Sequence, residues 1–316
     1  MIVVRGHLGF GDCIHQRAVL RELMKRDEVV LETFYSAMYH DLRERGLRLQ
    51  SIHGHPARVR ESKVLVNDSA PGKFNGGAIR HRMRYDATAV HRHGSILAAQ
   101  FACCGLRMPE RPDFSLPVPD AWRRAARERI GRADRPIMVY RPLVLNNLFH
   151  CEQRLPDVDV YAALYESVRD RYHVVSACNL GDYGERIVGP VMDADTELHR
   201  GELSGEELIG LYAEADLVFA CAGFAPVLAQ AVGTRCVVVY GGHEGFATTN
   251  SVGAHLAPTL AIEPVRVCEC HGGHYTRGPN QELVKPVRDH ECDKTTDLPA
   301  ALERLRAFVE GYDADT

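Results

Sequence analysis

The chain lacks the features that would mark it as a membrane, secreted or polyanion-binding protein. None of its apolar runs approaches the length of about 18 residues that a membrane-spanning helix needs. The opening MIVVRGHLG has neither the basic start nor the long apolar stretch of a secretory signal, so we expect a cytoplasmic protein with no transmembrane segment. Basic residues number 38 and acidic residues 42, and this balance argues against a chain devoted throughout to binding polyanions.

Short apolar runs alternate with amphipathic segments along the whole chain, which indicates parallel strands covered by helices. A chain of 316 residues is about twice the usual domain length. The stretch 105–120 holds four prolines and little periodicity, so it is the linker candidate. We therefore expect an α/β fold of two facing Rossmann-like domains with parallel sheets, residues 1–115 and 116–296, and a C-terminal helix, residues 297–316, that packs back on the first domain.

The expected elements follow from this alternation. In the first half the sequence predicts strands at Ile2–Val4, Val29–Phe34, Leu47–Ile52 and Lys63–Asn67. It predicts helices there at Asp12–Lys25, Ala37–Arg45 and Ser95–Cys104. In the second half it predicts helices at Ala121–Ile130, Val158–Arg171, Gly205–Ala215, Ala225–Val232 and Leu298–Tyr312, with strands at 136–140, 172–177, 216–222 and 235–242.

A glycine-rich turn, GHLGFGD, joins the first strand to the first helix. Its glycines let the backbone approach a ligand, and the helix start that follows favours an anion. The turn does not fit the dinucleotide pattern G-x-G-x-x-G. Asp12 is open to two interpretations here, a helix cap or a functional carboxylate.

Two strand ends in the second half also carry glycines. CAGFAP and VVVYGGHE end neighbouring strands, so both present backbone amides to one crevice, and this arrangement suits a diphosphate. The alternatives are that Gly223 is only a turn, Phe224 only core, and that His243 and Glu244 only cap the next turn. The candidate donor-binding residues at these ends are Gly223, Phe224, Ala225, Gly241, Gly242, His243 and Glu244.

The stretch GFGDCIHQRAVLREL resembles the N-terminal signature of the heptosyltransferase-like glycosyltransferases of family 9, roughly G-D-x5-P-x2-R-x-L. Gly11, Asp12, Arg21 and Leu23 fall in register, whereas Ala18 replaces the proline. The resemblance implies a GT-B fold, a nucleotide-sugar donor, and an inverting transfer that needs no metal. It also implies that Asp12 is the general base for an acceptor hydroxyl. The candidate acceptor contacts beside it are Gly9, Phe10, Gly11 and His15.

The segment from His199 to Glu244 is similar to the donor half of the same family, with helix, strand, helix and strand in the same order. The family's Asp-Ser-Gly and His are replaced here by CAGFAP, so phosphate contacts would come from backbone amides. The family's loop lysine near the phosphates is also missing. Arg141 or Arg154 could supply that charge, because an arginine grips phosphate with two donors.

A basic stretch runs from Arg58 to Arg92 within the first half, and Arg80 and Arg82 are its candidate acceptor-binding residues. Such a run is either a solvated face or a site for an anionic acceptor: a phosphorylated saccharide, a lipid-linked glycan or a nucleic acid. We expect its core, the segment from Asn67 to Gly94, to be a long irregular loop.

Cysteine and histidine gather late in the chain, in CECHGGHYTRGPNQELVKPVRDHEC. Thiolates and imidazoles this close suit a structural zinc ion. The spacing matches no standard finger, so a disulfide and unligated side chains stay open as alternatives. The zinc candidates are Cys268, Cys270, His271 and Cys292.

Together these patterns predict a hexosyl- or heptosyl-type transferase that moves a sugar from a nucleotide-diphosphate sugar to a hydroxyl of an anionic acceptor. Two other classes stay open. One is a DNA-modifying glycosyltransferase of viral type that acts on hydroxylated bases, for which the basic stretch is the sole support. The other is a non-catalytic GT-B protein that binds a nucleotide or a glycan, which the lost Asp-Ser-Gly and His make plausible.

Overall fold

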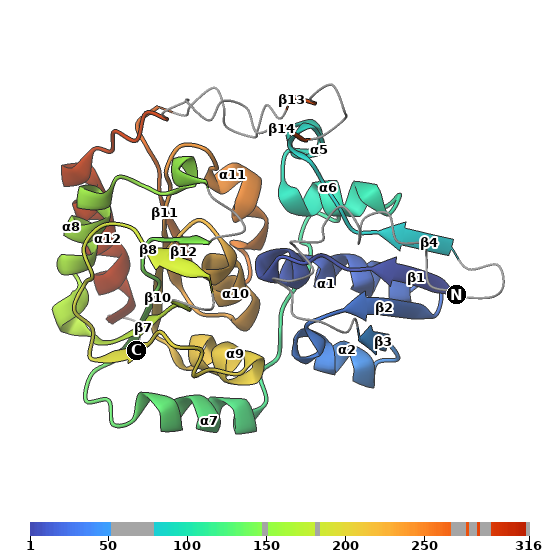
Figure 1. Ribbon diagram of the computed structural model, residues 1–316, viewed down its shortest axis with the longest axis horizontal. Coiled ribbons are helices and arrows are strands. Elements are labelled where there is room, and N and C mark those ends of the chain that lie inside the picture. Colours follow the sequence, from blue (N-terminus) through green and yellow to red (C-terminus); the bar gives the residue numbers. More distant parts are fainter. Residues whose placement is uncertain are drawn as a thin grey trace.

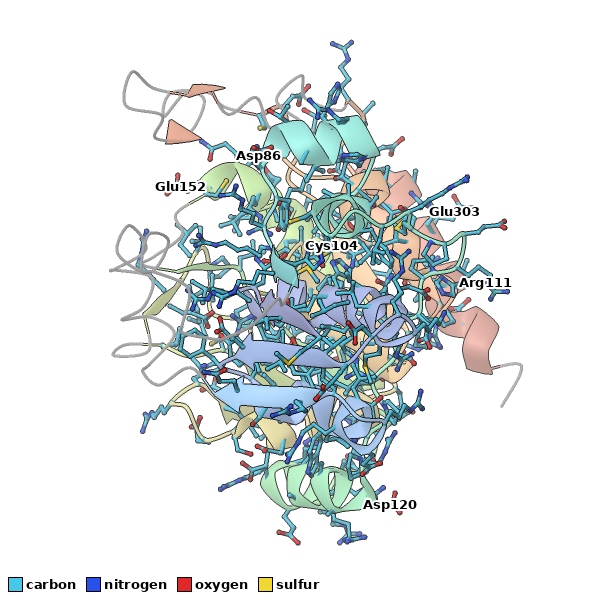
Figure 2. All side chains as sticks on the ribbon, turned by 90° about the vertical axis from the view of Figure 1, so that its right-hand side faces the viewer. Asp86, Cys104, Arg111, Asp120, Glu152 and Glu303 are labelled. Carbon is cyan, nitrogen blue, oxygen red and sulfur yellow. The ribbon has the colours of Figure 1, made fainter. Side chains whose placement is uncertain are left out.

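The computed structural model describes residues 1–51, 79–146, 151–180, 184–266, 276–277, 283–284 and 292–313. Within these ranges the chain folds into two parallel sheets with helices around them, one sheet in each half (Figure 1). In Figure 2 the N-terminal half faces the viewer, with Asp86 toward one end and Asp120 at the other. No helix in the described ranges combines the length and the apolar character needed to cross a bilayer.

The N-terminal sheet is parallel throughout and has the strand order β3-β2-β1-β4. Val3 of β1 lies opposite Val30 of β2 on one side and Arg80 of β4 on the other. The strands and helices of this half are β1 (Ile2–Arg5), α1 (Phe10–Met24), β2 (Val29–Thr33), α2 (His40–Glu44), β3 (Arg48–Ser51), β4 (Ile79–Arg82), α5 (Ala87–His93) and α6 (Ile96–Cys103), with a 3-10 turn η1 (Ser36–Tyr39).

The C-terminal sheet has the order β12-β11-β10-β5-β7-β9, and its neighbouring strands are also parallel. Its strands are β5 (Ile137–Tyr140), β7 (His173–Ala177), β9 (Thr196–Leu198), β10 (Leu217–Cys221), β11 (Cys236–Val239) and β12 (Thr259–Ile262). The helices are α7 (Asp120–Ile130), α8 (Val158–Glu166), α9 (Gly205–Glu214), α10 (Phe224–Val232), α11 (Phe246–Thr249) and α12 (Leu298–Asp313). The short elements are η2 (Glu152–Arg154), η3 (Arg169–Arg171), η5 (Ser251–Gly253) and the ribbons β6 (Val144–Asn146) with β8 (Glu185–Ile187) and β13 (Thr276–Arg277) with β14 (Leu283–Val284).

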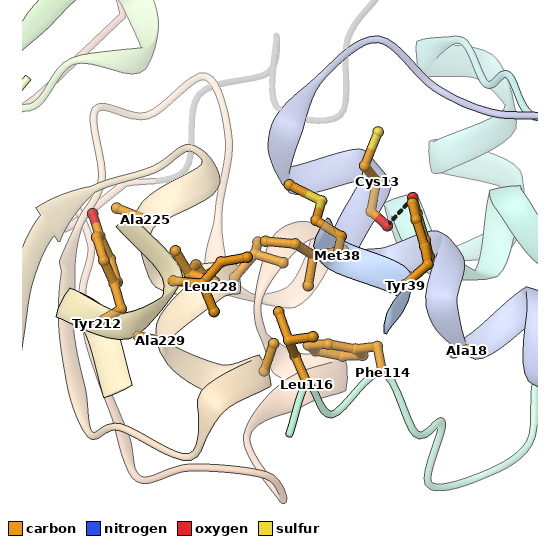
Figure 3. Close-up of a cluster of buried hydrophobic side chains, with 14 of the residues drawn as sticks. Cys13, Ala18, Met38, Tyr39, Phe114, Leu116, Tyr212, Ala225, Leu228 and Ala229 are labelled. Carbon is orange, nitrogen blue, oxygen red and sulfur yellow. Dashed lines mark hydrogen bonds between the residues drawn. The ribbon is translucent and has the colours of Figure 1, made fainter. Parts of the chain in front are cut away.

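One apolar core runs through both halves. Figure 3 shows Met38 of the N-terminal half near Leu228 of α10, with Phe114 and Leu116 of the linker beside them and Tyr39 farther into the N-terminal half. The backbone N–H of Leu116 also donates to the carbonyl of Ala231 at 2.7 Å. The linker is therefore packed into the interface between the halves. A second core, on the opposite face of the C-terminal sheet, lies beneath α8 and α12.

The last helix lies elsewhere than expected. Instead of returning to the N-terminal half, α12 packs against α8 and β12 (Figure 1). Its apolar side chains Ala301, Leu305 and Val309 are buried in the second core, together with Leu260 and Ile262 of β12. The reason is local: without α12, the apolar face of β12 at the sheet edge would be open to water.

The basic segment is more regular than expected. Residues 79–82 form β4, which pairs with β1, and residues 87–93 form α5, so the second part of the expected loop is a strand and a helix. Asp86 caps α5 by accepting from the Ala89 N–H at 2.8 Å. The expected strand Lys63–Asn67 lies outside the described residues. In the second half, α8 ends at Glu166 and the short turn η3 follows, where one longer helix was expected.

Candidate active site

The predicted carboxylate lies where β1 turns into α1. Asp12 is in the first turn of α1, and 22% of its side chain is exposed. The carboxylate folds back over Gly9, and a Cβ at that position would overlap Oδ2 of Asp12. A side chain at residue 9 would therefore displace the Asp12 carboxylate, whereas the backbone of Gly9 is extended, with φ −77° and ψ 136°, which any residue can adopt.

Two side chains hold the Asp12 carboxylate. The hydroxyl of Tyr85 donates to Oδ1 at 2.7 Å, and Nδ1 of His7 lies 3.6 Å from Oδ2. The rings of His7 and Tyr85 are in contact, with centroids 5.2 Å apart. Burial, and then the charge of Asp12, raise the pKa of Tyr85 well above its usual value, so its hydroxyl stays protonated.

The first glycine turn of the C-terminal half leads directly into α10. Gly223 has φ 156° and ψ −152°, a conformation that suits glycine alone. Among the described residues no side chain caps α10. Phe224 and Ala225 therefore contribute first-turn N–H groups without a helical partner, whereas Pro226 has none to offer. This helix start is suited to an anion.

The starts of α1 and α10 meet across the two halves. A Cβ at Gly11 would lie 3.1 Å from Cα of Phe224, so glycine permits the close approach. The Phe10 ring meets the Phe224 ring edge-on with centroids 5.2 Å apart. The glycine turn that precedes Asp12 and the turn at Gly223 thus lie together where the two halves meet.

Arg141 lies at this junction, and both of its terminal nitrogens donate hydrogen bonds within the C-terminal half. Its guanidinium donates to the carbonyl of Ala177 at 2.8 Å and to the Glu185 carboxylate, and it stacks 5.1 Å from the centroid of the Phe224 ring. Burial opposes its charge, yet the Glu185 carboxylate raises the pKa of Arg141. In this structure Arg141 is paired with the half-buried Glu185 carboxylate, and its contact with the donor phosphates stays a prediction.

Arg154, the other expected cation, lies beside the second glycine pair. Its guanidinium forms an ion pair with Glu244 at 2.9 Å, and 23% of its side chain is exposed. A Cβ at Gly241 would overlap the backbone of Arg154 and Leu155, so the loop after η2 packs tightly on the end of β11. Burial works against the charge of Arg154, but Glu244 raises its pKa. His243 joins the same loop by donating its N–H to Gln153 O at 3.3 Å.

The expected acceptor residues lie in three different places. Phe10 lies at the junction, edge-on to Tyr35 at 5.3 Å as well as to Phe224. His15 is only 2% exposed and packs edge-on to Phe114 of the linker, so it is part of the interface core rather than an open contact. Arg80 and Arg82 lie on the edge strand β4, and Arg82 is in register with Arg5 at the end of β1.

The zinc candidates are not brought together in the described part of the chain. Cys268, Cys270 and His271 lie outside it. Cys292 is buried, and a Cβ at Gly242 would lie 3.3 Å from its Cβ. Among the described residues, no three His, Cys, Asp or Glu side chains are grouped closely enough to hold a metal ion.

Sequence reasoning missed Tyr85, and it quoted His7 without a role. A signal for Tyr85 was present, because Ile79, His81, Met83 and Tyr85 alternate with three arginines at the period of a strand. The density of charge hid this alternation. Residues just beyond the carboxyl ends of neighbouring parallel strands are also where ligand-binding groups gather in open α/β sheets.

The chain is similar over nearly its whole length to glycosyltransferases of known structure. A glycosyltransferase of family 9 from Veillonella parvula has 11% identity and a TM-score of 0.57, with 98% of this chain and 97% of the other covered. Escherichia coli ADP-heptose LPS heptosyltransferase II has 13% identity and a TM-score of 0.57, with 99% of each chain covered. The iron-containing dodecameric glycosyltransferase TibC from enterotoxigenic E. coli has 12% identity and a TM-score of 0.64, with 100% of this chain and 76% of TibC covered.

No protein-family model matches the sequence, and no curated protein does. At these low identities the likeness concerns the fold. The expected α/β architecture with two parallel sheets is confirmed: the chain has the GT-B fold of the heptosyltransferase-like glycosyltransferases.

Proposed function

We propose that this protein is a glycosyltransferase that moves a sugar from a nucleotide-diphosphate sugar to a hydroxyl of an anionic acceptor. One observation carries the proposal. Asp12 lies in the first turn of α1 beside Gly11, and a Cβ on Gly11 would lie only 3.1 Å from Cα of Phe224 at the start of α10. A base from one half thereby meets a leaving-group site from the other half.

The diphosphate of the donor is proposed to lie at the start of α10. The N–H groups of Phe224 and Ala225 and the positive end of the helix dipole favour its charge. Arg154, beside Gly241, supplies the positive charge that a lysine supplies in the family. When the donor binds, Glu244 gives up its ion pair with Arg154 and accepts a hydrogen bond from a hydroxyl of the nucleotide-sugar. TibC has been crystallised with ADP-D-β-D-heptose, so that compound is the first donor to test.

The proposed reaction is one displacement at the anomeric carbon. Asp12 accepts the proton of the acceptor hydroxyl, and the acceptor oxygen forms a bond to the anomeric carbon. The bond from that carbon to the diphosphate oxygen breaks at the same time, and its electron pair leaves with the nucleoside diphosphate. The α10 amides and Arg154 stabilise that leaving charge. A single displacement inverts the anomeric configuration and requires no metal ion.

The acceptor is proposed to bind the N-terminal half beyond the end of the sheet. Arg5 and Arg82, adjacent in register, contribute positive charge there, together with Arg80 on the same strand. Arg5 also pairs with Glu32 at 2.7 Å, which holds its guanidinium in place. This arrangement favours an anionic saccharide or a lipid-linked glycan.

The proposal predicts opposite defects for two variants. Asp12→Asn should lower kcat by about 100-fold or more, because the base is lost, and should leave nucleoside diphosphate binding intact. Arg154→Gln should weaken that binding by about 10-fold or more, because a charge-assisted contact is lost. The measurements are ADP release from ADP-D-β-D-heptose with a phosphorylated oligosaccharide, and the rise in Tm produced by ADP, UDP, GDP and CDP.

The outcomes separate the alternatives. If Asp12→Asn transfers sugar as fast as the wild type, Asp12 is not the base and the mechanism is wrong. If a nucleoside diphosphate raises the Tm but no nucleotide-sugar is consumed, the result would favour a non-catalytic binding protein. Transfer to duplex DNA with hydroxymethylated bases, and not to the oligosaccharide, would favour the DNA-modifying class.

A further inference from the structure

The Asp12 carboxylate contacts two residues, each of which follows one of two neighbouring strands. Tyr85 comes three residues after β4 and donates its hydroxyl to Oδ1 at 2.7 Å. His7 comes two residues after β1 and presents Nδ1 to Oδ2 at 3.6 Å. Since β1 and β4 are adjacent and parallel, both residues reach the carboxylate from the same edge of the sheet.

We propose that Tyr85 is the positioning residue for Asp12, and that its hydrogen bond to Oδ1 fixes the orientation in which the carboxylate meets the acceptor hydroxyl. The inference rests on the proposed function, because it assigns Tyr85 a role through the base of that reaction. It adds a residue for which the sequence analysis had no role.

The surroundings leave the carboxylate little freedom. The missing Cβ of Gly9 provides the space that Oδ2 fills. The ring of Tyr85 lies against the ring of His7 at 5.2 Å, and His7 is itself anchored through its backbone. Its N–H donates to Oε1 of Gln16 at 3.1 Å, and its carbonyl accepts from Sγ of Cys13 at 3.1 Å.

The chemistry of the contact suits a base. Burial and the charge of Asp12 raise the pKa of Tyr85, so the hydroxyl remains a donor at neutral pH. The hydroxyl therefore keeps its proton and donates to Oδ1, which fixes how the Asp12 carboxylate is oriented. From the C-terminal half, the charge of Glu244 also raises the pKa of Tyr85, and the charge of Arg154 lowers it. Tyr85 therefore lies where the base meets the proposed donor site.

Removing only the hydroxyl tests the role. Tyr85→Phe should lower kcat by about 10- to 100-fold, because a misoriented base loses near-attack geometry, and should leave the donor KM within about twofold. The matched control is Tyr165→Phe, which removes a hydroxyl that donates to the Asp193 carbonyl in the C-terminal half. The control should keep the wild-type kcat, and the two variants should have similar Tm values.

A double-mutant cycle separates positioning from a general structural effect. If Tyr85 acts through Asp12, adding Tyr85→Phe to Asp12→Asn should not reduce the remaining rate further. Additive losses would show that Tyr85 works independently, and would overturn the inference. Should Tyr85→Phe fail to fold, Tyr85→Gln, which keeps a donor, is compared with Tyr85→Leu, and equal rates for the pair would likewise overturn it.

The two proposals fail in different ways. A fully active Asp12→Asn would remove the mechanism and this inference together. An inactive Asp12→Asn beside a Tyr85→Phe variant whose kcat stays within about threefold of the wild type would leave the function standing and refute the positioning role alone.

Discussion

His15, three residues after Asp12 on α1, is a polar side chain that packs in the interface core. His15 is 2% exposed and lies edge-on to Phe114 with ring centroids 5.1 Å apart. Burial lowers the pKa of His15 to about 4; Asp12 acts against this shift and His7 adds to it. The imidazole is therefore neutral in the folded protein at pH 7.

This buried histidine predicts a pH dependence of stability. In the unfolded chain His15 becomes protonated below about pH 6.5, whereas in the folded chain its lowered pKa delays protonation until about pH 4. Between these two pH values, acidification therefore favours the unfolded state. His15→Gln should remove about 2–3 kcal/mol of the stability that the wild type loses between pH 7.5 and 4.5. Urea unfolding at both pH values measures the difference.

The exposed His93 offers the matched control. His93→Gln should lose as much stability on acidification as the wild type, because His93 is exposed and lies outside the interface core and the change leaves His15 in place. An unchanged loss in His15→Gln would contradict the assignment.

At the level of elements, the close contact of α7 with α9 depends on one glycine. A Cβ at Gly210 of α9 would overlap the backbone carbonyl of Trp122 on α7. Salt bridges flank this contact, including Arg127 to Glu214 and Arg129 to Glu207. Exposed pairs of this kind add little, so the apolar contact that Gly210 permits is the main attraction.

Alanine at two glycines of α9 should therefore act in opposite ways. Gly210→Ala should destabilise the protein by about 1–3 kcal/mol, because overpacking against a backbone atom outweighs the better helix propensity. Gly205→Ala, in the first turn and with open space around it, should be neutral or slightly stabilising. Denaturant unfolding of the two variants decides, and equal effects would refute the packing argument.

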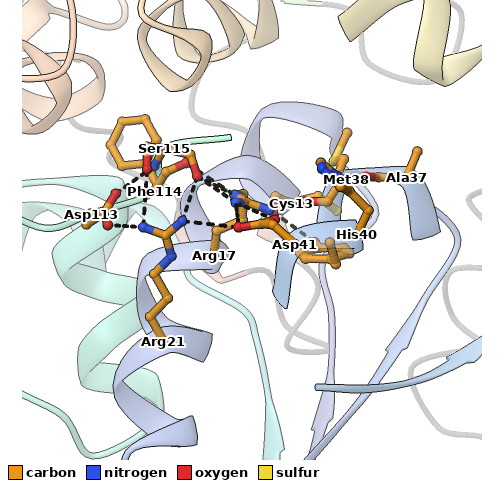
Figure 4. Close-up of polar contacts among 11 residues, drawn as sticks. Cys13, Arg17, Arg21, Ala37, Met38, His40, Asp41, Asp113, Phe114 and Ser115 are labelled. Carbon is orange, nitrogen blue, oxygen red and sulfur yellow. Dashed lines mark hydrogen bonds and ion pairs between the residues drawn. The ribbon is translucent and has the colours of Figure 1, made fainter. Parts of the chain in front are cut away.

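At the scale of the molecule, a buried arginine ties the linker to the N-terminal half. Arg17 forms an ion pair with Asp41, 2.9 Å from each carboxylate oxygen, and also donates to the carbonyls of Met38, Phe114 and Ser115 (Figure 4). Arg21 adds contacts to Ser115 O at 2.8 Å and to Asp113. The network fixes the linker that joins the two halves, and with it the meeting of α1 and α10.

Breaking this network should be costly. Arg17→Met should destabilise the protein by about 3 kcal/mol or more, because the Asp41 carboxylate and the linker carbonyls lose their buried donor. Asp41→Leu added to it should restore part of the loss, because it removes a buried carboxylate left, among the described residues, with only the longer contact to Arg21, at 3.4 Å. Guanidinium unfolding measures both variants, and a double variant less stable than Arg17→Met would contradict this account.

Much of the fold was predictable because it depends on local periodicity. The elements around Asp12 and around Phe224 were expected from glycine turns that join apolar runs to amphipathic stretches, and the structure confirms them. Strand β4 was missed because arginines fill every second position, so polarity concealed the alternation. The partner of α12 was misjudged because an amphipathic helix reveals that it has an apolar face, and not which sheet edge lacks cover.

The sequence by itself determined the types of element, the two-sheet class and the presence of a carboxylate in a glycine turn, since these follow from neighbours along the chain. The tertiary structure alone decided that Tyr85 donates a hydrogen bond to Asp12, that Arg141 forms an ion pair with Glu185, and that His15 lies in the interface core. These contacts join residues 44 to 99 positions apart along the chain. The order of strands and the approach of the two halves decide which of them form, and no local pattern encodes either.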